Sequence, residues 1–255
     1  MKDYEKALEK FIQPWIKKKE VIGILLCGSY VTGNPTKNSD LDVQIILDDK
    51  VTWRERGNKI IDGFLIEYFA NPVKMNYIYF DEDFEGNRLI QANMISTGKV
   101  IYSKDNQTIS KLKKDAKKYL NKAFKKPNKT FIEIKKYHLW DLLDNLDEAY
   151  NNKEINFDFI YYNFLNEMKD IYFKAKQYHF IQAHKTERLI FDKKNQKKYL
   201  VRELEDKKFK SLFKKCLEVK SKKDKIEAFK NLNRHILKEL GGFNIDGWKI
   251  KTKAE

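Results

Sequence analysis

The chain has 255 residues, of which 42% are hydrophobic and 14% aromatic, and this composition excludes a disordered protein. It contains no run of roughly 18 apolar residues, and its first segment is charged and amphipathic, which argues against a membrane span or a secretory signal. Its two cysteines, Cys27 and Cys216, do not suggest a disulfide framework. We therefore expect a cytoplasmic protein with no membrane partner.

Basic residues outnumber acidic ones by 52 to 37, which gives a formal net charge of +15. The excess is concentrated late in the chain, because residues 185–225 contain 16 basic and 7 acidic side chains. Such a segment is either a solvated helical face or a surface that binds anions. A lysine-rich composition also arises without any nucleic-acid function, so the charge leaves a nucleic-acid partner open.

The first half of the chain mixes helical and strand-like segments. Apolar residues at helical spacing predict a helix over residues 3–19, which Pro14 kinks or shortens. Continuous apolar runs bounded by turn residues predict buried strands, and residues 75–80 begin a further element. The predicted strands are 21–29, 41–47, 64–70 and 99–103, and a helix over 107–124 follows them.

After Pro127 the strand-like pattern disappears and helical periodicity takes over. We expect helices over 129–150, 156–184, 197–219 and 223–240, the last of them ended by Gly241-Gly242. The predicted fold class is α+β, with a mixed-sheet domain over residues 1–127 followed by an all-α helical bundle over 128–255.

One segment, CGSYVTGNPTKNSDLDVQIIL at residues 27–47, carries side chains suited to phosphates and metals. Gly28 would let the backbone approach a phosphate closely, and the Ser29 hydroxyl with nearby amides would donate hydrogen bonds to it. A glycine-serine pair after a strand is more often only a turn, so this pair needs support from elsewhere.

Asp40 and Asp42 supply that support. Residues i and i+2 of a strand point to the same face, so both carboxylates project together while Leu41 and Val43 face the core. Two such charges about 4 Å apart repel by roughly 4 kcal/mol at an effective dielectric near 20, which calls for a cation. Hard oxygen ligands suit Mg²⁺. In the alternative interpretation, Asp40 caps a turn and Asp42 is solvated.

Together, Gly28-Ser29, Gly33 and Ser39-Asp40-Leu41-Asp42 resemble the signature of the DNA polymerase β-like nucleotidyltransferase superfamily. The resemblance implies a palm-like mixed sheet whose aspartates hold two Mg²⁺ ions, which align the α-phosphate of an NTP, first of all ATP, with an acceptor. Pyrophosphate then leaves. The superfamily also supplies a third carboxylate from a later strand. Glu67 is the candidate, unless it faces solvent, and Asp62 is the fallback.

Other side chains are weaker candidates. For the nucleotide we expect Gly28, Ser29, Ser39, Arg54 and Lys59, with Arg56, Arg88 and Lys99 as further basic candidates, although basic loop residues are usually only solvated. A helical stripe of Tyr137, Asp141, Asp144 and Glu148, with Glu133 one turn earlier, either lines an acceptor pocket and supplies a general base or is a solvated face.

The order of domains resembles that of bacterial aminoglycoside and lincosamide nucleotidyltransferases. This resemblance implies transfer of AMP to a hydroxyl of a small, antibiotic-like acceptor, and related enzymes are often homodimers. The basic charge argues against a cationic acceptor. The alternative is an enzyme that modifies tRNA or a protein in a toxin or defence setting. A catalytically silent binding module is a third hypothesis, which the intact aspartate pair disfavours.

Overall fold

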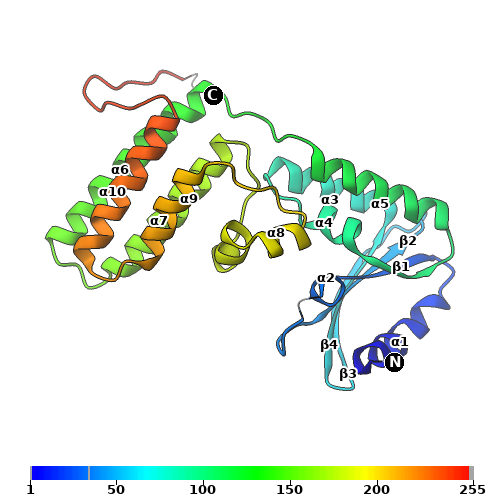
Figure 1. The fold of residues 1–255 in the computed structure, drawn as a ribbon. Helices are drawn as coiled ribbons and strands as arrows, with labels where there is room; N and C mark the ends of the chain where they lie inside the picture. Colours follow the sequence, from blue (N-terminus) through cyan, green and yellow to red (C-terminus); the bar gives the residue numbers. More distant parts are fainter. Residues whose placement is uncertain (1, 34, 253–255) are drawn as a thin grey trace. The chain divides into compact units, whose positions relative to one another are not determined.

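The computed structural model of the protein describes residues 2–33 and 35–252, and the chain divides into two compact units. Unit 1 extends to Ala123 and also includes Lys198–Leu200, and unit 2 holds the remainder from Phe124 onward. A mixed sheet with helices precedes a helical region, which confirms the predicted α+β class (Figure 1). Within the described ranges, no helix combines the length and apolar character that crossing a membrane requires.

Unit 1 is built on a five-stranded sheet with the strand order β3-β4-β2-β1-β5. The pair β2 and β4 is parallel, and every other neighbouring pair is antiparallel, so the sheet is mixed as expected. Four strands fall on the predicted strand segments. The strands are β1 (Val21–Cys27), β2 (Leu41–Leu47), β3 (Glu55–Ile61), β4 (Phe64–Pro72) and β5 (Lys99–Ser103).

The strand β3 is absent from the sequence prediction. Its side chains are exposed or half-buried along its whole length, so it lacks the apolar run by which the other strands are found. It forms a hairpin with β4 through Asp62 and Gly63, which adopt φ angles of 50° and 82°. Two consecutive residues with positive φ are typical of a type I′ turn, for which Asp-Gly is a favoured sequence.

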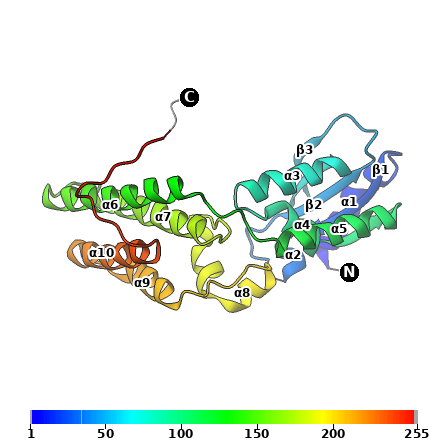
Figure 2. The ribbon, with the colours of Figure 1, turned by 90° about the horizontal axis from the view of Figure 1, so that it is seen from above.

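Helices cover both faces of this sheet (Figures 1 and 2). On one face, α1 (Asp3–Ile16) packs Phe11 and Trp15 against strand residues such as Val43. On the other face, Phe80 and Leu112 pack with strand residues of β1 and β2. The covering helices of this second face are α3 (Val73–Glu85), α4 (Ile90–Thr97) and α5 (Asn106–Asn121), while α2 (Ser29–Thr32) is a single short turn after β1.

Unit 2 contains a helical bundle with an aromatic core that includes Tyr161, Tyr172, Phe209 and Phe229. Two predicted helices are shorter than expected, since the second ends at Ala175, before Gln177 adopts a φ of 60°, and the third begins only at Lys207. The helices are α6 (Lys129–Asn151), α7 (Phe157–Ala175), α8 (Lys193–Lys198), α9 (Lys207–Glu218) and α10 (Lys222–Glu239), with short turns η1 (Ala183–Lys185) and η2 (Glu187–Phe191).

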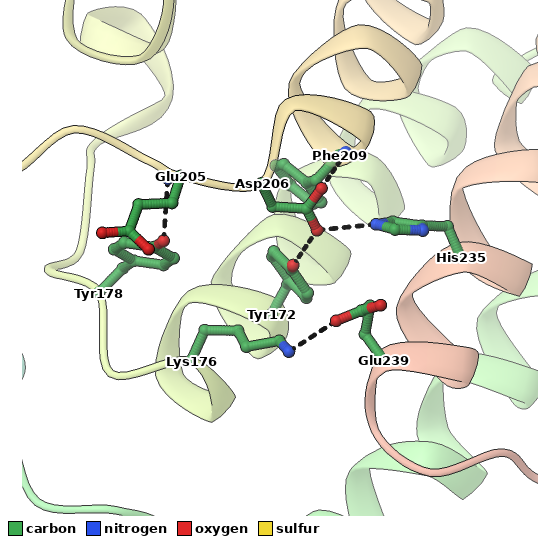
Figure 3. A network of polar contacts seen from close by, with 8 residues as sticks. All are labelled: Tyr172, Lys176, Tyr178, Glu205, Asp206, Phe209, His235 and Glu239. Carbon is green, nitrogen blue, oxygen red and sulfur yellow. Dashed lines mark hydrogen bonds and ion pairs between the residues drawn. The ribbon is translucent and has the colours of Figure 1, made fainter.

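A polar network around Asp206 joins three of these helices (Figure 3). Asp206 caps α9 by accepting a hydrogen bond from Phe209 N–H at 2.8 Å, and its second oxygen accepts one from the Tyr172 hydroxyl of α7. His235 Nε2 of α10 lies 2.8 Å from that same oxygen. Burial of Asp206 alone would raise its pKa, but these hydrogen bonds outweigh burial and lower the pKa to about 2. The Asp206 carboxylate therefore stays charged and connects α7, α9 and α10.

This lowered pKa predicts a pH-dependent stability. Because the carboxyl titrates lower in the folded chain than in the unfolded one, its contribution is complete above about pH 4 and is lost as the pH falls toward 2. Asp206→Asn should lower the free energy of unfolding by about 2 kcal/mol at pH 7, and the difference from wild type should shrink between pH 4 and pH 2. Urea unfolding followed by circular dichroism measures this, with the exposed Asp144→Asn as control; a difference independent of pH would refute it.

Candidate active site

Three acidic side chains of unit 1 meet on one face of the sheet. Asp40, Asp42 and Glu67 each place one carboxylate oxygen within 4.8 Å of the other two. Asp42 and Glu67 are register partners on the parallel strands β2 and β4, and Asp40 lies just before β2. Two residues after Asp42, Gln44 accepts a hydrogen bond from Gln91 of α4 at 3.1 Å, so this is the face that α3, α4 and α5 partly cover.

Gly28 packs directly against this cluster. A Cβ atom at position 28 would lie 1.8 Å from Asp42 Oδ2, far inside van der Waals contact. The residue also adopts φ 68° and ψ −152°, a region of backbone conformation that is essentially restricted to glycine. Both observations require glycine at the end of β1, and they explain why the predicted strand over 21–29 ends at Cys27.

The loop from α2 to β2 contains the remaining residues of the motif. Ser29 begins α2, and Gly33 ends it with a φ of 80°. Ser39 is tied to its own loop, because its hydroxyl accepts a hydrogen bond from Thr36 N–H at 2.8 Å and its N–H donates to Thr36 O at 3.0 Å. These two hydrogen bonds close a turn of the backbone just before Asp40.

The carboxylate cluster has the donor chemistry of a magnesium or manganese site. Its ligand atoms are all oxygens, and charges 4.8 Å apart repel by about 3 to 4 kcal/mol per pair at an effective dielectric near 20. Arg56 Nη2 approaches Glu67 Oε1 to 2.7 Å, but the Arg56 side chain is 70% exposed, so this pair contributes only about 1 kcal/mol or less. A divalent cation would therefore stabilise the three carboxylates, whose charges otherwise repel one another.

The other predicted residues are distributed over the molecule. Arg54 and Arg88 line a pocket beside the cluster, on the β3 side. Lys59 pairs in register with Ile66, whose side chain belongs to the opposite, α1-covered face, so the structure does not bring Lys59 to the carboxylates. Asp62, the fallback third carboxylate, instead forms an ion pair with Lys10 at 2.7 Å.

Neither Lys99 nor the predicted acidic stripe is part of this cluster. Lys99 is exposed at the start of β5. The stripe of α6 belongs to unit 2, where Asp144 and Glu148 are exposed and Asp141 is half-buried. Its outer members therefore read as a solvated face.

Sequence analysis did not identify the pocket residues Phe69, Tyr79 and Gln91. They come from β4, α3 and α4, and no local spacing connects them. A signal for this region was nevertheless present, because Asp62-Gly63 between apolar residues indicates a hairpin, and a hairpin places Arg56 beside Glu67 and Phe69.

In comparisons with known proteins, a family model covers the part of the chain that holds this cluster. Residues 9–107, which include Gly28 and all three carboxylates, match the family model described as polymerase beta, nucleotidyltransferase. Among solved structures, the nucleotidyltransferase-like protein from Exiguobacterium sibiricum 255-15 is similar at 12% sequence identity, with a TM-score of 0.47, over 92% of this chain and 75% of that chain. No curated protein matches the chain.

The contact between Gly28 and Asp42 predicts the effect of one methyl group. Gly28→Ala should displace the Asp42 carboxylate and weaken Mn²⁺ binding at least about tenfold, since the added Cβ overlaps a ligand atom. Isothermal titration calorimetry measures this affinity. The control is Gly63→Ala, which has a similar positive φ of 82° with nothing within 4 Å of its Cβ. Equal affinities of the two variants would contradict the packing argument.

Proposed function

We propose that this chain, whose residues 9–107 form a nucleotidyltransferase domain of the polymerase beta family, transfers a nucleoside monophosphate from an NTP to an acceptor hydroxyl. ATP is the proposed donor. The acceptor oxygen forms a new bond to the α-phosphorus, the bond from that phosphorus to the bridging oxygen breaks, and pyrophosphate leaves with the electron pair. The hydroxyl proton passes to water.

One observation carries the proposal, namely the convergence of Asp40, Asp42 and Glu67 beside a glycine that contacts Asp42. The three carboxylates would hold two Mg²⁺ ions, which would stabilise the charge that develops on the phosphates and the attacking oxygen. Gly28 and Ser29 would bind the triphosphate through backbone and hydroxyl donors, because they follow β1 next to Asp42. Ser39 and its loop would fix the position of Asp40.

Two acceptor classes follow from the sequence, and each has support. A small, antibiotic-like molecule agrees with the order of the two domains. A nucleic-acid acceptor such as tRNA is favoured by unit 2, where many of the lysines between residues 193 and 223 are exposed. Incubation with α-labelled ATP, Mg²⁺ and a panel containing lincomycin, kanamycin and tRNA separates the two classes by the molecule that gains label.

Removal of one cluster aspartate tests the chemistry itself. Asp42→Asn should abolish label transfer to any acceptor while the fold persists, because losing one charge relieves repulsion among the three carboxylates. Transfer assays and thermal unfolding on the same preparation measure both effects. Transfer at the wild-type rate would refute the assigned role of Asp42, and an unfolded variant would contradict the electrostatic argument.

Glu67 has a separable role on the acceptor side. Glu67→Gln should reduce the transfer rate by a factor on the order of 100 or more, with ATP affinity close to that of wild type, because the proposed triphosphate donors, Gly28 and Ser29, follow β1 on the other side of β2 from β4. Single-turnover rates and equilibrium ATP titrations separate these quantities. Full activity would mean that the third carboxylate lies elsewhere.

A further inference from the structure

Two exposed apolar side chains lie beside the carboxylate cluster, on the hairpin of β3 and β4 (Figure 1). Ile60 is 72% exposed and Leu65 is 43% exposed. They are register partners across the hairpin, so their side chains point to the same face of the sheet. Leu65 precedes Glu67 by two residues, which makes this face the one that carries the carboxylates. We call Ile60 and Leu65 together the apolar platform.

The platform differs from the residues next to it in the chain. Ile61 and Phe64 are nearer the turn, point to the opposite face and pack against the core that α1 covers. Ile60 and Leu65 instead remain exposed, although β3 is an edge strand. Proteins usually place polar or charged side chains at such an edge, because exposed apolar ones favour aggregation. An exposed apolar pair at this position therefore indicates a binding surface.

Strand register places the platform next to Asp40. In the parallel pair β2 and β4, Asp42 is the partner of Glu67. Two residues earlier on each strand, Asp40 is level with Leu65, which is itself the partner of Ile60 on β3. The acidic cluster is thus followed by apolar side chains on the same face, in the direction of the β3 edge of the sheet.

The glycine-serine turn lies on the other side of the cluster. In the antiparallel pair β1 and β2, Cys27 is the partner of Asp42, and Gly28 and Ser29 follow it. Because β1 runs opposite to β2, the turn extends toward the level of Asp40. The order across this face of the sheet is therefore the turn, the carboxylate cluster and the platform.

This order assigns the platform to the acceptor. In an in-line displacement, the leaving pyrophosphate and the attacking oxygen lie on opposite sides of the α-phosphorus. With the triphosphate at the turn and the α-phosphate at the cluster, the attacking hydroxyl arrives from the side of Glu67 and the platform. The nucleoside oxygen is neither the entering nor the leaving group, so the ribose and base lie away from this line.

The surroundings of the platform carry little net charge. Asn58, the next residue of β3 on this face, is exposed and uncharged, whereas Lys59 points to the α1-covered face. Arg56 is engaged by its ion pair with the cluster, and at the turn the charges of Asp62 and Lys10 offset each other at 2.7 Å. A ligand on the platform therefore gains mainly from removing apolar surface from water.

We propose that Ile60 and Leu65 bind an apolar face of the acceptor, and that the acceptor is a small amphipathic alcohol whose reacting hydroxyl lies near an alkyl or aromatic group. The inference rests on the proposed function and specifies its acceptor class. The ammonium groups of a polycation and the phosphates of a nucleic-acid strand would gain nothing from contact with these two side chains.

A two-stage titration of the full chain tests the proposal. The first stage measures binding of α,β-methylene-ATP with Mg²⁺, because the methylene bridge prevents transfer. In the second stage, ligand-observed NMR follows the titration of the saturated protein with phenyl β-D-glucoside or methyl β-D-glucoside. The two compounds share every hydroxyl and differ only in the apolar group. The phenyl compound should bind at least about fivefold more tightly.

Ile60→Thr isolates the platform, because threonine keeps the branched shape that suits a strand but exchanges apolar surface for a hydroxyl. It should reduce the preference for the phenyl compound to about twofold or less and change the affinity of the nucleotide analogue by less than about twofold. Leu65→Thr repeats the measurement from the neighbouring strand. The matched control is Val100→Thr, a 40% exposed position on β5, the opposite edge strand, and it should leave the preference unchanged. Thermal unfolding detects any loss of hairpin stability separately, since a cross-strand apolar pair also stabilises a hairpin.

The outcomes separate the two levels of the argument. Failure of the nucleotide analogue to bind the wild-type protein would refute the proposed function. If the analogue binds, then equal affinities of the two glucosides, or a preference that neither platform variant alters, would overturn the acceptor inference alone. Weaker binding of the analogue by folded Ile60→Thr would place the nucleoside on the platform and would also overturn it. Label transfer from ATP to the phenyl compound in preference to the methyl compound would support it, whereas preferential labelling of kanamycin or tRNA over the phenyl compound would overturn it.

Discussion

The register between the parallel strands β2 and β4 determines the whole site, because it places Asp42 directly beside Glu67. Repulsion opposes this arrangement, and apolar packing holds it. Ile66 and Tyr68 flank Glu67 in the chain and belong to the face that α1 covers, so a slip of one residue would turn Glu67 into that apolar layer. Burying an unpaired carboxylate there would cost far more than the few kcal/mol of like-charge repulsion that the register imposes. The core of unit 1 thus maintains an electrostatic strain that a divalent cation would relieve.

The magnitudes explain why Arg56 does not remove that strain. A largely exposed guanidinium contributes up to about 1 kcal/mol to its pair with Glu67, less than the repulsion between a single pair of carboxylates in the cluster. Arg56 also lies over the Phe69 ring, 4.8 Å from its centre, and at an exposed position this contact contributes about as much as the ion pair. A divalent cation bound by Asp40, Asp42 and Glu67 would therefore meet little competition from Arg56.

Sequence reasoning found the parts that burial and local spacing encode. The strands β1, β2, β4 and β5 contain apolar residues in short runs. Asp40 and Asp42 are two residues apart, and side chains at this spacing point to the same side of an extended chain. It missed β3, whose exposed side chains from Glu55 to Lys59 carry no apolar signal, and it therefore treated Arg56 as a loop residue rather than as a neighbour of Glu67. Tyr79 and Gln91 were not predictable in principle from spacing, because tertiary packing alone brings α3 and α4 to the edge of the sheet. Two predicted helix ends in unit 2 were wrong. The helix α7 ends before Gln177, which has a positive φ, and α9 begins only after its cap residue Asp206.

The carboxylate cluster and the neighbouring pocket are built on different parts of unit 1. The proposed metal ligands sit on or beside β2 and β4, interior strands whose register is fixed by buried residues on both sides. The pocket is formed mainly by the edge strand β3, the residues that precede it and the helices α3 and α4, with Phe69 and Asn71 of β4 at its base, and side chains such as Arg54 and Glu82 are exposed there. Substitutions at exposed edge positions change stability little, whereas a change at Gly28 or Leu41 alters the core or the carboxylates directly. If the proposed function holds, a substitution on the β3 side would alter the pocket while leaving Asp40, Asp42 and the Gly28-Ser29 turn in place.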